Sequence, residues 1–168
     1  MADENVGLVG AIYAHANAVT NAAANEIAEF RGGWTIALEP TFAEWFGQST
    51  VRKAAEMTKL DVVLTVSEVA FKPATLSKLW DITPGAVAIK SVAEEAATSY
   101  TFGSTVTPLE LQYLIECKLD GQLFQAYAPT GKINTSTINF TNEDFVVHDV
   151  PIILYGATGS LLTLIDED

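Results

Sequence analysis

A regular alternation of apolar and polar residues over 108–128 is the clearest structural signal in this sequence. The odd positions from 109 to 119 are apolar, and the even positions between them are polar except for Leu114. A repeat of two residues is typical of a β-strand with one buried face and one face in water. Asp120-Gly121 then matches a type I′ turn, so we expect a hairpin whose second strand covers 122–128.

The turn also predicts which residues of this hairpin face each other. A two-residue turn pairs Leu119 with Gln122. The expected pairs on the apolar face are then Cys117 with Phe124 and Ile115 with Ala126. Leu114 and Tyr127 pair on the opposite face. Two large side chains there indicate that this second face meets another sheet or another subunit.

Shorter stretches predict further strands and one helix. The expected strands are 8–14, 34–39, 60–67, 133–140, 145–155 and 161–165. Pro40 should end the second of them, because proline cannot donate to a sheet, and 129–132 should form a loop. Pro73 can begin a short helix, in which Leu76, Leu79 and Trp80 share the face that docks on the sheet.

Five to eight strands with one helix predict a mostly β fold. We expect an antiparallel β-sandwich or a partly open barrel with one flanking short α-helix. The length of 168 residues fits a single domain covering 1–168, in which 1–33 forms an N-terminal strand or arm. The Ala- and Asn-rich segment 15–29 fits either a short helix or an arm, and 87–103 has no clear pattern.

Residues 41–46 contain the aromatic side chains Phe42, Trp45 and Phe46. A capping-box pattern at the start of this stretch allows one helical turn, and a continued strand is the alternative. So many aromatic side chains either form a small satellite core or contact another subunit.

The next stretch, 46–59, is polar and reads as a long loop. It holds Arg52, Lys53 and Lys59, three of the nine basic residues of the chain. Long loops in compact domains usually have a function. We therefore expect it to bridge subunits.

The net charge of −12, from 21 acids against 9 bases, argues against ordinary nucleic-acid binding, which needs a basic surface. It does not exclude a surface past which a polyanion slides. No apolar run is long enough for a membrane helix, and the acidic start does not resemble a signal peptide, so we expect synthesis in a cytosol and no membrane insertion.

Motifs for catalysis are not found in the sequence. It has no phosphate-binding loop, no dinucleotide glycine motif and no nucleophile elbow. His15 has no partner at metal-ligand spacing, and Cys117 lies on an apolar strand face, where a buried thiol is expected. We therefore expect no enzyme activity, no cofactor and no metal site.

The order of these features over 7–165 resembles the tail tube protein (major tail protein) of long-tailed bacteriophages. Four pieces carry the resemblance: Phe30-Arg31-Gly32-Gly33 before the strand 34–39; a polar loop before the strand 61–67, followed by Leu76-Ser77-Lys78-Leu79-Trp80; the hairpin at Asp120-Gly121 with 124–129; and the run 145–154 with a glycine-containing turn and a closing strand.

The resemblance implies hexameric rings that stack into a hollow tube, through which double-stranded DNA passes without specific binding. It also implies a virion location after synthesis in the bacterial host cytoplasm, other tail proteins as partners, and arms and one long loop that bridge the rings. On this reading, the contacts involve Phe42, Trp45, Phe46, Arg52, Lys53 and Lys59. The acids expected to face the lumen are Asp61, Glu68, Glu110, Glu116 and Glu143.

A different class of function is the alternative. A β-sandwich that binds a host-surface or carbohydrate ligand would use an exposed Trp45 or Trp80. The spacing of Trp80 from Leu76, however, predicts that Trp80 belongs to the core.

Overall fold

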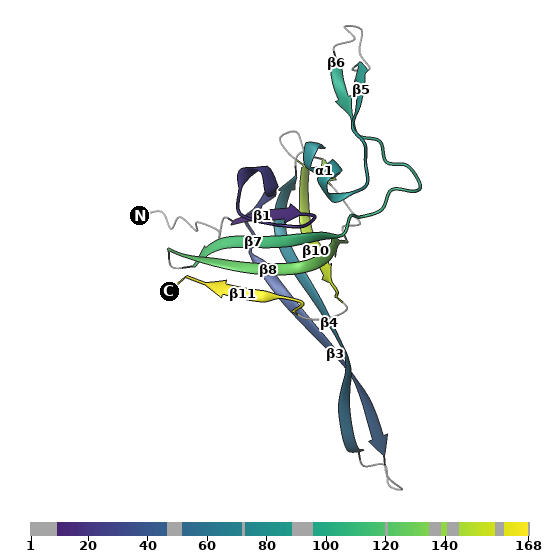
Figure 1. Ribbon diagram of the computed structural model, residues 1–168, viewed down its shortest axis with the longest axis vertical. Helices are drawn as coiled ribbons and strands as arrows, with labels where there is room; N and C mark the ends of the chain where they lie inside the picture. The colour runs from purple at the N-terminus through teal and green to yellow at the C-terminus, as the bar shows by residue number, and fades with distance from the viewer. Residues whose placement is uncertain are drawn as a thin grey trace.

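The computed structural model describes residues 10–46, 52–71, 73–88, 96–119, 121–134, 139–140, 145–156 and 160–167. This part of the chain forms eleven β-strands, one α-helix and one 3-10 helix (Figure 1). In order they are β1 (Gly10–His15), η1 (Ala23–Asn25), β2 (Glu26–Phe30), β3 (Trp34–Phe46), β4 (Arg52–Phe71), α1 (Pro73–Leu79), β5 (Gly85–Ala88), β6 (Ala96–Ser99), β7 (Leu111–Leu119), β8 (Gln122–Ile133), β9 (Asn139–Phe140), β10 (Phe145–Leu154) and β11 (Thr163–Asp166). The mostly β fold class is confirmed, with more strands than expected.

Six strands form the ring of a barrel. The order β1–β2–β4–β10–β8–β7 returns to β1, and every pairing is antiparallel. The closing contact is short, since only Ile152–Leu154 of β10 pairs with Gly131–Ile133 of β8. This agrees with the predicted partly open barrel. β3, β9 and β11 each add to one strand of the ring.

The central hairpin, β7 with β8, has the predicted register, including the pair of Leu114 with Tyr127. The apolar face of β7 points into the barrel, where Tyr113 and Ile115 are fully buried. Cys117 is buried as well, and the indole N–H of Trp34 donates to its Sγ at 3.4 Å. The two-residue repeat in the sequence therefore identified the inner face of the barrel correctly.

Helix α1 packs on the barrel as the spacing of its apolar residues predicts. Leu76, Leu79 and Trp80 are buried in the main core. On the other side of the helix, Lys78 Nζ donates to the backbone carbonyls of Ala24 and Glu26, at 3.1 and 3.4 Å. These contacts tie α1 to the start of β2.

The Ala- and Asn-rich segment forms no α-helix. After β1 it folds back over the outer face of β7, where the backbone N–H of Val19 donates to Gln112 Oε1 and Asn21 Nδ2 donates to Glu116 Oε2. Leu114, on the same outer face, is only 6% exposed. Part of this face is thus covered by the chain's own segment. The segment ends in η1 and β2, a strand that the sequence pattern did not predict.

Gly32 and Gly33 lie between β2 and β3. Gly33 has a positive φ of 81°, which glycine adopts without strain. Arg31 and Gly32 donate backbone hydrogen bonds to the carbonyls of Glu68 and Ser67. β4 changes its partner from β2 to β3 at this point, and Glu68 has the unusual φ of 55°.

Several predicted boundaries were wrong because the strands are longer than expected. β3 passes through Pro40 and continues to Phe46, since β3 has a neighbour on one side only, where proline is tolerated. The expected loop 46–59 is strand from Arg52 onward, and the expected loop 129–132 belongs to β8. The expected strand 133–140 is divided between β8 and β9.

Two hairpins project from opposite ends of the long axis (Figure 1). One consists of the outer parts of β3 and β4. The other is the two-stranded sheet of β5 and β6, which occupies part of the unassigned region 87–103. The barrel therefore lies between two projections that differ in length and composition.

Candidate interaction surface

The longer projection begins where β4 loses its second neighbour. The last pair between β4 and β10 joins Val62 to Leu154. Farther out, β4 pairs with β3 alone. We call this hairpin the arm and define it as Leu38–Phe46 with Arg52–Asp61. Among the described residues, β3 is the one strand beside β4 in this part, and the large apolar side chains of the arm are correspondingly exposed.

One face of the arm continues the inner face of the barrel. In the barrel part of β4, Leu64 and Val66 on this face are fully buried. The alternation continues outward along both strands, but the side chains become exposed. The exposed fractions are 62% for Leu38, 50% for Phe42, 53% for Met57 and 37% for Leu60. We call these four residues the arm face; a contiguous exposed apolar surface is typical of contact sites.

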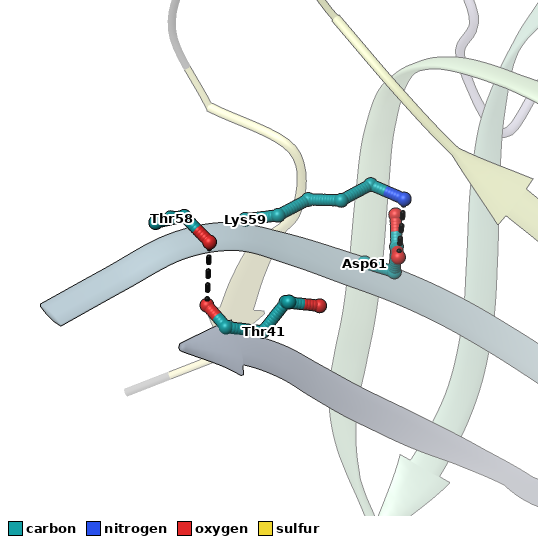
Figure 2. A network of polar contacts seen from close by, with 4 residues as sticks. All are labelled: Thr41, Thr58, Lys59 and Asp61. Atoms are coloured by element: carbon teal, nitrogen blue, oxygen red, sulfur yellow. Dashed lines mark hydrogen bonds and ion pairs between the residues drawn. The ribbon is translucent and has the colours of Figure 1, made fainter. Parts of the chain in front are cut away.

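An irregularity in the pairing interrupts the arm. Thr41 pairs with Lys59, but the next residue, Phe42, pairs with Met57, so Thr58 is an extra residue in β4. This arrangement is a β-bulge. Figure 2 shows that the Thr58 hydroxyl donates to the Thr41 carbonyl, at 3.1 Å.

An ion pair lies beside the bulge. Lys59 Nζ is 2.7 Å from Asp61 Oδ2 (Figure 2). Both side chains are well exposed, at 64% and 46%, and exposed pairs of this kind contribute about 0–1 kcal/mol. Two residues predicted for different roles, one for a contact and one for the lumen, are therefore partners of each other.

The other predicted contact residues lie toward the end of the arm. Trp45 pairs with Ala54 and is 50% exposed, so the satellite core, one of the two alternatives for this aromatic group, is not formed around it. Phe46 and Arg52 form the last pair of the hairpin. The side chains of Phe46, Arg52 and Lys53 lie outside the described part of the structure.

The arm also differs from the rest of the chain in charge. Residues 38–61 contain four acids and three bases, a net charge of −1, so the other residues account for −11 of the total −12. The arm is therefore nearly neutral on a strongly acidic protein.

The acids proposed for a lumen do not form one cluster. Asp61 lies on the arm, and Glu68 is exposed where β4 changes partners. Glu110 precedes β7, whereas Glu116 lies six positions farther along, or roughly 20 Å at the rise of a strand. Glu143 lies outside the described residues.

A different acidic group, which the sequence did not predict, forms around Tyr13. Glu29 and Glu116 both pair with Ala11 from opposite sides, so the two carboxylates share the outer face of the sheet. With Glu26 they line an open depression beside Tyr13. Burial raises the pKa of Tyr13, and the three nearby carboxylates raise it further. The cluster was missed because β2, which carries two of the acids, was not predicted.

Glu110 has a specific partner in Tyr155. The Tyr155 hydroxyl donates to Glu110 Oε2 at 2.6 Å, and Lys132 Nζ lies 5.8 Å from the centre of the Tyr155 ring. Burial, followed by the hydrogen bond to Glu110 and its charge, raises the pKa of Tyr155 to about 12. This contact joins the strand end of β10 to the residues before β7.

Within the described ranges, no three His, Cys, Asp or Glu side chains are placed to hold a metal ion. No helix in this same part of the chain is long and apolar enough to cross a membrane. Comparison of the sequence with models of known protein families and with curated proteins gives no match.

Proposed function

We propose that this chain is a non-enzymatic structural protein that self-assembles through its arm, as a tail-tube-like protein of a long-tailed bacteriophage. The observation that carries self-assembly is the arm face, four large apolar side chains that remain 37% to 62% exposed in the described chain. Six subunits per ring, the stacking of rings into a tube and the virion location come from the resemblance described above.

The distribution of charge favours the arm as the contact. Two copies that each carry −12 repel one another. The repulsion is weakest where the local charge is smallest, and the arm carries only −1. Exposed apolar area in a nearly neutral region allows close approach at little electrostatic cost.

The same charge supports a role as a conduit for DNA. A ring of six such chains would carry roughly −72, six times the net charge of one chain. Buried unpaired carboxylates are too costly, and Glu68 and Glu110 are exposed. Carboxylates of this kind on a channel wall would repel phosphates over about 8 Å at physiological salt, so DNA would slide without sticking.

Negative-stain microscopy and light scattering of the purified protein test this function. We expect rings or tubes from the wild type and loss of both in the double variant Phe42→Ser with Met57→Ser. Leu164→Ser, which removes an apolar side chain of similar exposure on β11, is the matched control and should retain them. A wild-type protein that stays monomeric at high concentration in several salts would contradict the proposal.

The basic residues of the arm give a second test. Arg52 pairs with Phe46 at the outer end of the hairpin, and Lys53 is the next residue of β4. We propose that both bases lie against carboxylates of a neighbouring copy. Reversing both to Glu should shorten or abolish the tubes and leave the thermal transition of the monomer unchanged. Tubes of normal length would show that these two charges do not contribute to assembly.

The alternative is a module that binds a host-surface or carbohydrate ligand. Trp45 favours it, since its side chain is 50% exposed, whereas Trp80 is buried and does not. A monomeric wild type whose tryptophan fluorescence changes with glycans, and no longer does so in Trp45→Ala, would favour this second function.

A further inference from the structure

The Thr58 bulge changes which residues face each other in the outer arm. If the register of the inner arm continued without it, Phe42 would face Thr58 and Glu44 would face Glu56. Like charges directly opposite each other destabilise a strand pair. With the bulge, Phe42 faces Met57 and Glu44 faces Ala55. The extra residue therefore extends the apolar face beyond the bulge and separates two acids.

A bulge also bends its strand and increases the local twist. The arm has Leu38 and Leu60 on the barrel side of the bulge, and Phe42 and Met57 on the outer side. Figure 1 shows the two strands of the arm twisting about each other as they leave the barrel. The outer half of the arm face is thus turned relative to the inner half.

We propose that the Thr58 bulge orients the arm for self-association, and that the Thr58 hydroxyl is the positioning group that holds it. The inference rests on the proposed function, because the surface that it orients is the arm face. The hydroxyl is suited to this role because it supplies a hydrogen bond to the Thr41 carbonyl at the place where the regular pairing is interrupted.

The occupant of the oriented face is a second copy of this chain. The arm presents apolar side chains and a net charge of −1, whereas a basic partner would be drawn to the residues that carry the remaining −11. A partner of the same composition avoids that acidic surface and binds where it is neutral. Lys59 and Asp61 form an ion pair beside the bulge, so these two charges offset each other there.

Three variants at position 58 separate the orientation of the arm face from its residue composition. Deletion of Thr58 removes the bulge and retains the pairs of Thr41 with Lys59 and of Phe42 with Met57. Thr58→Val removes the hydroxyl and keeps the β-branched shape. Thr58→Ser keeps the hydroxyl and is the matched control. All three lie outside the barrel, so circular dichroism and thermal unfolding should match the wild type.

Self-association is measured by sedimentation velocity over a range of concentrations. The deletion and Thr58→Val should weaken it about tenfold or more, a change that this method resolves, and Thr58→Ser should restore the wild-type value. Wild-type association in both the deletion and Thr58→Val overturns the inference and leaves the proposed function standing. Stronger association in the deletion also overturns it, because the bulge would then protect against edge-to-edge pairing. A wild type that does not associate overturns both.

Discussion

The barrel and the arm share strand β4 and differ in what covers it. Leu64 and Leu60 both lie in β4, on the same face and four residues apart. Leu64 is fully buried, and Leu60 is 37% exposed. The periodicity of the strand is the same in both places. The difference shows that β4 keeps its apolar face beyond the point where the barrel buries that face.

The polar contacts of the two regions differ as well. The barrel is joined to its surroundings by hydrogen bonds between residues far apart in sequence, such as Lys78 with the carbonyls of Ala24 and Glu26. On the arm, Thr58 donates to Thr41 in the facing strand, and Lys59 pairs with Asp61 in the same strand. Hence the barrel stabilises itself, and we expect the arm to gain order from a neighbour.

The sharpest test of this comparison replaces each leucine in turn. Leu64→Ala leaves a cavity in the barrel and should lower the free energy of unfolding by about 2–5 kcal/mol. Leu60→Ala is the matched change on the arm and should stay within about 0.5 kcal/mol. Urea unfolding followed by circular dichroism measures both values. Equal losses would mean that the arm contributes to the fold of the monomer.

Close packing of the barrel predicts the next effect. Gly10 of β1 lies against Phe30 and Glu116, and an added Cβ would overlap the Phe30 ring and the Glu116 carbonyl. Gly10→Ala should therefore cost about 1–3 kcal/mol, as measured by thermal unfolding. Gly103→Ala is the control, because its Cβ would meet nothing within 4 Å. A neutral Gly10→Ala would show that β1 can move away without loss.

A buried hydroxyl makes the barrel weaker at one place. Tyr113 is fully buried, and its hydroxyl has no hydrogen-bond partner of good geometry among the described residues. Burial raises the pKa of this hydroxyl, and the nearby backbone of Ile133 offsets part of the rise. Tyr113→Phe should be neutral or should stabilise the protein by up to about 1 kcal/mol. A clear loss of stability in urea unfolding would reveal a partner for this hydroxyl.

The smallest effect concerns alkaline pH. The pKa of Tyr155 rises from its usual 10 to about 12 in the folded protein, so the folded state keeps a proton that the unfolded state has lost between these values. Stability should therefore fall as the pH rises from 10 to 12. In Tyr155→Phe this decline should be shallower, while the loss at pH 7 should be about 1 kcal/mol or less. Unfolding midpoints measured across this pH range give the change of stability with pH. If that change is the same in Tyr155→Phe and in the wild type, other groups cause the decline.

The sequence predicted the parts of the barrel in which periodicity and turn chemistry agree. The register of β7 with β8 follows from Asp120-Gly121 and an apolar face that is in fact buried. β2 was missed because Glu and Ala, which make up three of its five residues, have weak strand propensity. Its place was set by pairing with β1 and β4. The pairing of β2 with its neighbouring strands, and not its local propensity, thus determined that it is a strand.

The candidate surface was predicted less well. Phe42 and Trp45 were identified as unusual, but whether they were covered depended on pairing between β3 and β4. The stretch 52–59 was predicted as a loop, because a ribbon with two exposed faces needs no regular apolar repeat. The bulge at Thr58 is likewise visible only in the register.

Hydrogen–deuterium exchange at increasing protein concentration tests the central claim most directly, because it reports which amides become protected when copies associate. We predict that added protection is concentrated in the arm, over 38–46 and 52–61, and that the barrel strands β1, β7 and β8 exchange at nearly the same slow rates throughout. An arm that exchanges equally fast at every concentration, while the barrel gains protection, would contradict the account.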